Sequence, residues 1–114
     1  MQIELTRFKV KEGKSSKVNE WMKLLRDRLP EVLATLDGEK MYVEAIFREQ
    51  TTAGEYLYWF SIRGKDGINI KESKHEIDKL HLKYFNECID AKDPNARTNI
   101  PIELFLQSKN TRIA

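Results

Sequence analysis

The chain contains one cysteine, five glycines and three prolines among its 114 residues. Because Cys88 has no second cysteine to pair with, neither an intrachain disulfide nor a cysteine-based zinc cluster can form. Glycine-rich phosphate loops and serine-nucleophile motifs are missing too. No apolar run approaches the roughly 20 residues that span a bilayer, and residues 1–10 lack the apolar core of a signal peptide. We therefore expect a cytoplasmic protein that does not associate with membranes.

An excess of charge of one sign is also missing. The 20 Lys and Arg residues are nearly balanced by 18 Asp and Glu, which leaves a net charge of +2, and both signs are mixed along the chain. Proteins that bind nucleic acid usually gather their cations on one face. We expect no nucleic-acid partner. The hydrophobic fraction of 40% and charged fraction of 33% are typical of one folded domain with one core.

Aromatic and β-branched residues are concentrated in residues 40–64, KMYVEAIFREQTTAGEYLYWFSIRG. Two runs rich in such residues, 41–49 and 55–63, flank a turn at residues 50–54. Residues of these types suit a pleated, half-buried surface, and the spacing between the runs suits a hairpin. The stretch therefore predicts two paired β-strands at the centre of the chain.

The residues before this hairpin predict a strand and a helix. Residues 2–10 alternate as a strand does, and apolar residues at positions 18–36 recur at steps of three and four, as in an amphipathic helix. Ser15 or Ser16 is expected to cap this helix. Pro30 lacks an N–H and crowds the preceding turn, so we expect a kink or break just before it.

The residues after the hairpin repeat the strand and helix signals in the opposite order. Residues 71–91 predict a second helix and residues 99–107 a last strand, in which Pro101 favours an edge position. The resulting order, βαββαβ, predicts an α+β fold of the ferredoxin-like type, a four-stranded antiparallel sheet with two helices on one face. We assign residues 1–107 to a single domain and residues 108–114 to a polar tail.

Both faces of the predicted sheet are apolar. On one face the third strand places four side chains, Tyr56, Tyr58, Phe60 and Ile62, and on the other it places Leu57 and Trp59. Two helices can cover only one face, and soluble monomers seldom expose a large aromatic patch. Two-fold pairing of the uncovered faces removes that exposure. The pattern therefore predicts a homodimer.

Four separated blocks of the sequence carry a resemblance to a known family: LTRFKVKEGKS, EKMYVEAIFRE, EYLYWFSIRG and SKHEIDKLHLKYFNECID. Together they resemble an uncharacterised bacterial family of small single-domain proteins, over nearly the whole chain to about residue 90. That family has no established function, so the resemblance implies no catalytic residues. In its order of elements it is similar to the dimeric α+β barrel superfamily, which includes antibiotic-biosynthesis monooxygenases, haem-degrading enzymes and stress-responsive barrel proteins. This similarity implies a small-molecule pocket between the sheet and the helices.

A cluster of ionisable residues lies on the second predicted helix. His81 is expected to face inward, with Asp78 one turn earlier and able to hold its ring in one tautomer. The spacing of His75 and His81 differs from the i, i+4 pair of zinc proteases, so we predict no metal site. His81 is either a proton carrier or ligand contact at a pocket floor, or a core histidine hydrogen-bonded to a strand residue. We favour the second role.

Glu44 and Arg48 fall on one face of the second predicted strand. They could form a polar pocket, with Glu44 as acid, base or anchor and Arg48 clamping an anionic group. Since burying an unpaired charge is costly, we favour the alternative that each belongs to a structural ion pair. An aromatic wall could stack a planar ligand, although such residues more often serve packing. It consists of Tyr42, Tyr56, Tyr58 and Trp59, with Trp21 on the first predicted helix.

Three functions remain open from the sequence. The first is a homodimeric barrel that binds a small planar or aromatic molecule, with or without a cofactor-independent oxidation or isomerisation in which His81 is the base. The second is a haem-binding or monooxygenase-like enzyme, and the third is a non-catalytic dimeric interaction domain. No residue pattern requires catalysis, and no cofactor is predicted. The candidate ligand-binding residues are Glu44, Arg48, Tyr58, Trp59, Asp78 and His81, of which His81 and Glu44 are the catalytic candidates.

Overall fold

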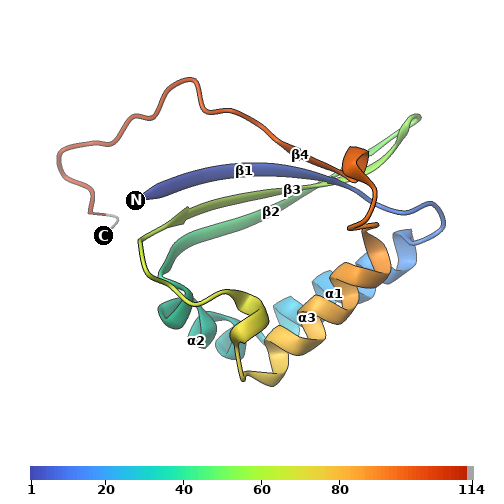
Figure 1. Cartoon of the computed structure of the whole chain (residues 1–114), viewed down its shortest axis with the longest axis horizontal. Helices are drawn as coiled ribbons and strands as arrows, with labels where there is room; N and C mark the ends of the chain where they lie inside the picture. The colour runs from blue at the N-terminus through green and yellow to red at the C-terminus, as the bar shows by residue number, and fades with distance from the viewer. Residues whose placement is uncertain (113–114) are drawn as a thin grey trace.

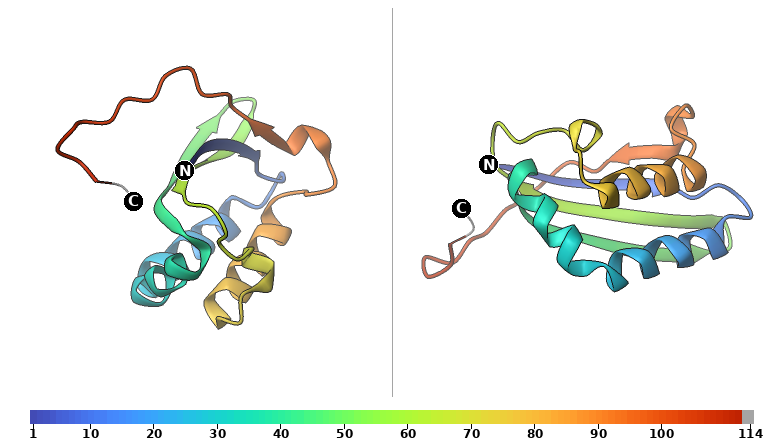
Figure 2. Two further views of the ribbon diagram at one scale, coloured as in Figure 1. Left: turned by 60° about the vertical axis from the view of Figure 1, so that its left-hand side comes forward. Right: turned by 90° about the horizontal axis from the view of Figure 1, so that it is seen from below.

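Four antiparallel strands form one sheet, in the order β2-β3-β1-β4, in a computed structural model that describes residues 1–112. Three helices lie against one face of this sheet, whereas no helix covers the other face in the described part of the chain (Figures 1 and 2). The elements are β1 (Gln2–Lys9), α1 (Ser15–Asp27), α2 (Leu29–Glu39), β2 (Met41–Thr51), β3 (Gly54–Arg63), η1 (Ile70–Glu72), α3 (Glu76–Cys88), η2 (Pro94–Ala96) and β4 (Arg97–Asn99). The predicted α+β, ferredoxin-like arrangement is confirmed.

The strands of the β2–β3 hairpin are longer than the runs 41–49 and 55–63 that predicted them. Pairing continues to Gln50 and Glu55 and closes at Thr51 and Gly54, so the turn is tighter than predicted. Gly54 has a φ of +145°, a backbone conformation that residues with side chains rarely adopt. The glycine therefore allows the strands to pair up to the turn.

The break predicted before Pro30 separates α1 from α2. Arg28, with φ −111° and ψ 32°, lies outside both helices, and Pro30 falls in the first turn of α2, where its missing N–H breaks no helical bond. The predicted serine cap is wrong: α1 begins at Ser15 itself, and no side chain of the described residues caps it. The hydroxyl of Ser15 instead donates a 3.0 Å hydrogen bond to Glu55.

Helix α3 is shorter than the predicted helix 71–91. A 3-10 turn, η1, precedes it, because the side chain of Asn69 accepts a hydrogen bond from the backbone N–H of Lys71. After Cys88 the chain becomes extended, and Ile89 forms an isolated bridge to Val10. None of the helices within residues 1–112 is long and apolar enough to cross a membrane.

The predicted last strand, 99–107, is wrong beyond Asn99. β4 pairs with the middle of β1, and the backbone N–H of Ile100 makes the last bond, 2.8 Å to the carbonyl oxygen of Leu5. Residues 101–112 are exposed, and the chain projects away from the sheet (Figure 1). Residues 113–114 of the predicted polar tail lie outside the described residues.

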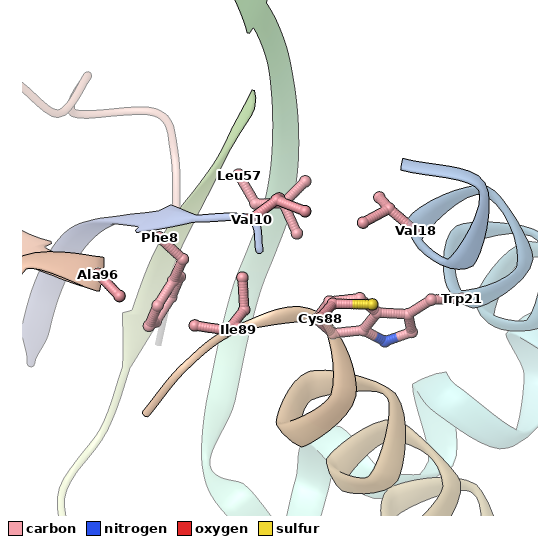
Figure 3. Packing of buried hydrophobic residues seen from close by; sticks show 8 residues of the cluster. All are labelled: Phe8, Val10, Val18, Trp21, Leu57, Cys88, Ile89 and Ala96. Atoms are coloured by element: carbon pink, nitrogen blue, oxygen red, sulfur yellow. The ribbon is translucent and has the colours of Figure 1, made fainter. Parts of the chain in front are cut away.

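The core lies between the sheet and the helices α1 and α3. Figure 3 shows its side chains converging from the sheet, from α1 and α3 and from the segments next to them: Phe8, Val10, Val18, Trp21, Leu57, Cys88, Ile89 and Ala96. Trp21 and Leu57 are fully buried. The thiol of Cys88 is also buried, and burial raises its pKa, which makes it a packing residue rather than a nucleophile. This core holds α1 and α3 against the sheet at one end of the molecule.

Candidate functional site

A cavity of about 240 Å³ lies between the helices and the sheet, beyond the end of the core. Its wall combines apolar side chains from α1, α2 and the segment before α3 with polar ones from α2, β2, β3 and α3. The residues that line it are Leu25, Val32, Thr35, Leu36, Glu39, Met41, Glu44, Trp59, Arg63, Ile68, Asn69, Ile70, Ile77, Asp78 and His81. The cavity shares several of these residues with a wider groove of about 750 Å³ that reaches β1. At about 240 Å³ the cavity is slightly smaller than the range of about 300–1,000 Å³ that is common for ligand pockets, so only a small ligand would fit it.

His81 stands between two tryptophans. Its ring centroid is 5.4 Å from that of Trp21 and 5.3 Å from that of Trp59. The indole Nε1–H of Trp21 donates a 2.9 Å hydrogen bond to Nδ1 of His81. Burial lowers the pKa of the imidazole to about 4, against an opposing effect of Asp78, so the ring is neutral at pH 7. Because Nδ1 accepts, the proton of the neutral ring resides on Nε2, and His81 offers the cavity a hydrogen-bond donor.

Three carboxyl groups share the cavity with this donor. Burial raises the pKa of Glu39 to about 7, helped by the negative charges of Asp78 and Glu44 and opposed by Arg63. Burial also raises the pKa of Glu44, an effect that a hydrogen bond from the Trp59 side chain partly offsets. Glu39 is therefore in a position to exchange a proton near neutral pH.

Asp78 supplies the third carboxyl group. Its side chain is 6% exposed, and among residues 1–112 its Oδ2 atom has no hydrogen-bond partner. Buried polar atoms are nearly always paired, so this oxygen is an exception among the described residues. Within the same described range, no three His, Cys, Asp or Glu side chains are arranged to hold a metal ion.

A family model matches almost the entire chain. Residues 1–112 match the model described as "Family of unknown function (DUF6176)". The chain belongs to this family. No curated protein matches this DUF6176 chain.

Among solved structures, the chain is similar to the crystal structure of L-rhamnose mutarotase FA22100 from Formosa agariphila. The TM-score is 0.56 at 19% sequence identity, over 96% of this chain and 100% of the mutarotase chain. At this level of identity the similarity concerns the fold alone, and it agrees with the ferredoxin-like assignment of the DUF6176 protein.

The structure brings four of the six predicted ligand residues of this DUF6176 protein together. Glu44, Trp59, Asp78 and His81 all line the cavity. Residue alternation explains this for the strands, because Glu44 and Trp59 lie on the faces of β2 and β3 that the helices cover. His81 is bonded to Trp21 of α1, so the expected partner on a strand is wrong.

Arg48 and Tyr58 lie away from the cavity. The Arg48 guanidinium donates hydrogen bonds of 2.7 and 2.9 Å to Glu55, and a further bond to the carbonyl oxygen of Ser15, at the hairpin end of the sheet. Arg48 thus belongs to a structural ion pair, with Glu55 in place of Glu44. Tyr58 alternates with Trp59, so it points to the open face, where its hydroxyl donates to Glu49 at 2.9 Å.

Glu39 was not expected in the site, and Trp21 was expected there only as part of an aromatic wall. Glu39 follows Val32 and Leu36 at helical steps of four and three, so its place on the inward stripe of α2 is readable in the sequence. Trp21 was expected on the apolar face of a helix. A buried indole N–H needs a hydrogen-bond acceptor, so the sequence indicates that Trp21 has a polar partner, which the structure identifies as His81.

Proposed function

We propose that this protein binds a small, uncharged molecule bearing several hydroxyl groups and catalyses a proton-transfer isomerisation of it. The reaction class is that of mutarotation, in which a sugar ring opens and closes again. The observation that carries the proposal is the pairing, in one cavity, of a neutral imidazole donor with a carboxyl group whose pKa is about 7. Groups that titrate near the working pH are the most effective general acids and bases.

The charges in the cavity favour an uncharged ligand over an anionic one. Glu39, Glu44 and Asp78 face a single cation, Arg63, within the lining. A carboxylate or phosphate on the ligand would be repelled, whereas hydroxyl groups could donate to the carboxyl oxygens of the lining. The ring face of Trp59 offers a flat surface for the carbon skeleton.

The proposed chemistry needs no oxidant and no cofactor. A base removes the proton of the anomeric hydroxyl group, the bond from the anomeric carbon to the ring oxygen breaks, and an acid protonates that oxygen. Rotation and the reverse steps close the ring as the other anomer. Glu39 and Glu44 are suited to give and take these protons. His81 acts here as a ligand contact rather than as the base, and it holds a substrate oxygen through Nε2–H.

The test measures anomer exchange by NMR for a panel of neutral sugars, with L-rhamnose as the first because the similar fold comes from a protein of that name. We expect the wild-type chain to accelerate exchange of at least one sugar. Glu39→Gln and Glu44→Gln should each reduce the acceleration about 100-fold or more. Glu12→Gln, an exposed surface glutamate, is the matched control.

Binding is followed separately by thermal shift, because a ligand that binds the folded state raises its melting temperature. Neutral sugars should raise it in the wild-type chain more than the corresponding sugar phosphates do. If no sugar or cyclic polyol in the panel raises the melting temperature or speeds exchange, the proposal is wrong.

We also propose that the chain forms a homodimer through the open face of the sheet. Register places Leu5, Ala45 and Phe60 side by side on that face, together with Phe47, which is 60% exposed. Pairing these apolar surfaces removes them from water. A dimer with unaltered behaviour in every cavity variant would favour the third alternative, a non-catalytic interaction domain.

The haem-binding alternative has weaker support. Three carboxyl groups beside His81 would repel the carboxylates of a haem, and Nδ1 of the ring is already bonded to Trp21. A Soret band that forms when haemin is added, and that is lost in His81→Ala, would reinstate this alternative.

A further inference from the structure

The residues that follow β4 form an apolar segment that their own subunit does not bury. We call residues 100–106 the C-terminal arm. Leu104 is 73% exposed, Leu106 is 80% exposed and Ile102 is 56% exposed. Figures 1 and 2 show that the arm leaves the sheet after β4 and runs, clear of the strands, on the side of the sheet away from the helices. The Cα radius of gyration is accordingly 14.9 Å, whereas a compact domain of this size has about 13 Å.

The sequence of the arm conflicts with this exposure. Ile100, Ile102, Leu104 and Leu106 alternate with other residues, and such alternation is the pattern of a strand that buries one face. Within the described residues the arm nevertheless makes no strand pairing after the bond from Ile100 to Leu5. A segment patterned for burial on one side, but left in water by its own subunit, requires a surface elsewhere.

The second observation is a matching unpaired surface on the same chain. β2 is an edge strand, with β3 on one side and no strand on the other in the part of the chain that the structure describes. Its Phe47 and Val43 are 60% and 40% exposed and lie on the open face. An exposed edge strand with apolar side chains is the kind of surface to which an extended segment adds as a further strand.

The root of the arm lies beside the proposed dimer interface. β4 pairs with β1, and β1 contributes Leu5 to the open face, opposite Phe60 of β3. A second copy seated on that face would therefore lie next to the point at which the arm leaves the sheet. Two-fold symmetry then makes any transfer of an arm reciprocal, so both arms are covered at once.

We propose that in the homodimer the arm of each subunit crosses to the partner and packs Leu104 and Leu106 along the outer edge of the partner's β2. The inference rests on the proposed homodimer, and it adds a specific interaction surface and a specific occupant. It also explains why the strand pattern of residues 99–107 has no counterpart within one subunit: its pairing partner belongs to the other copy.

The test compares the dimer dissociation constants of the full chain, a chain that ends after Ile100, and the double variant Leu104→Lys/Leu106→Lys by analytical ultracentrifugation. Both changes should raise the dissociation constant at least tenfold. The double variant Gln107→Lys/Asn110→Lys adds the same charge just beyond the arm and should leave the constant unchanged. Because the arm is exposed in its own subunit, the altered chains should keep the circular dichroism spectrum of the full chain.

A second measurement locates the arm even where an altered chain folds poorly. In a Cys88→Ser background, Phe47→Cys and Leu104→Cys should give a disulfide-linked dimer on mild oxidation, whereas Leu33→Cys with Leu104→Cys should not. Arm variants that dimerise as tightly as the full chain, or oxidation that leaves Phe47→Cys/Leu104→Cys unlinked, overturn the arm exchange but leave the homodimer standing. A full chain that is monomeric at about 100 µM overturns both.

Discussion

The hydrogen bond of 2.9 Å from Nε1 of Trp21 to Nδ1 of His81 lets a core residue decide the protonation of a cavity residue. Trp21 is fully buried in the core between α1 and α3, whereas His81 lines the cavity. With Nδ1 occupied as an acceptor, a protonated imidazole would set two N–H groups against each other. The bond therefore acts together with burial to keep the ring neutral, with its proton on Nε2.

His81 should make the fold sensitive to acid. Its pKa is about 4 in the folded chain against an ordinary value of 6.5, so between these values the unfolded chain binds a proton that the folded chain does not. Stability should therefore fall as the pH falls from 6.5 to 4. Urea unfolding should show that the wild-type chain loses about 2–3 kcal/mol more than His81→Gln over this range. Equal losses in the two chains would show that His81 titrates normally.

Glu39 should make the stability of the fold depend on pH in the opposite direction to His81. Its pKa is about 7 when folded and 4.5 ordinarily, so between these values the unfolded chain releases a proton that the folded chain keeps. Stability should fall as the pH rises through this window, by about 1–2 kcal/mol because the side chain is only half-buried. The same unfolding measurement should show Glu39→Gln to be more stable than the wild-type chain at pH 8, with Glu12→Gln unchanged.

The pH range over which His81 changes the stability overlaps that of Glu39, so their opposite effects on the free energy of unfolding partly cancel in the wild-type chain. Glu39→Gln should then gain stability as the pH rises from 4 to 6.5, because the effect of His81 is left alone. His81→Gln should lose stability over almost the same range. Parallel pH profiles for the two variants would contradict this assignment of opposite signs.

Trp21→Phe should remove the donor and keep most of the packing. Leaving Nδ1 of His81 unpaired in a buried position costs about 1–3 kcal/mol of unfolding free energy. The variant should also admit the tautomer with the proton on Nδ1, which ¹⁵N chemical shifts of the ring report directly. Trp59→Phe is the matched control, since its indole does not bond to the imidazole. A ring whose nitrogen shifts are the same in wild type and Trp21→Phe would contradict the role given to this bond.

The central hairpin and the helix break were predictable because their signals are local. Alternation within residues 41–49 and 55–63 needs only the pleat of a strand, and Pro30 acts through its own ring and missing N–H. The serine cap failed because Ser15 lies next to Glu55, which is distant in sequence and takes the hydroxyl hydrogen. The prediction of the last strand was wrong because, within the described residues, the apolar side chains that alternate after Asn99 find no surface of their own subunit to pack against.

The candidate site was predictable to the extent that strand alternation determines it. Glu44 and Trp59 were placed by the face of the sheet to which they belong, and His81 with Asp78 by helical spacing. Arg48 lies four residues after Glu44 along an extended strand, so its side chain is beyond the cavity and pairs with Glu55 near the hairpin turn. The pKa of Glu39 depends on the burial and on Asp78 and Glu44 together, which come from three different elements. No pattern within one segment contains that information.

Arg48→Ala should separate structure from ligand binding. The guanidinium holds Glu55 and the start of α1, and Arg48 is not among the residues that line the cavity. Because the pair is partly exposed, its loss should cost about 1 kcal/mol of unfolding free energy. Any ligand found by thermal shift should raise the melting temperature of Arg48→Ala by as much as that of the wild-type chain. A smaller rise would return Arg48 to the list of ligand contacts.

Phe47→Arg should break the dimer without harming the subunit. Phe47 is 60% exposed in a single chain, so its replacement removes little packing from the monomer and places a charge on the face that a second copy would cover. Light scattering should report a monomer for this variant under conditions in which the wild-type chain is a dimer. Leu33→Arg makes the same kind of change at an apolar residue of α2 that is 54% exposed. Because α2 lies on the opposite side of the sheet, this control should remain dimeric, and a dimer that survives Phe47→Arg with unchanged affinity would show that the open face is not the interface (Figure 2).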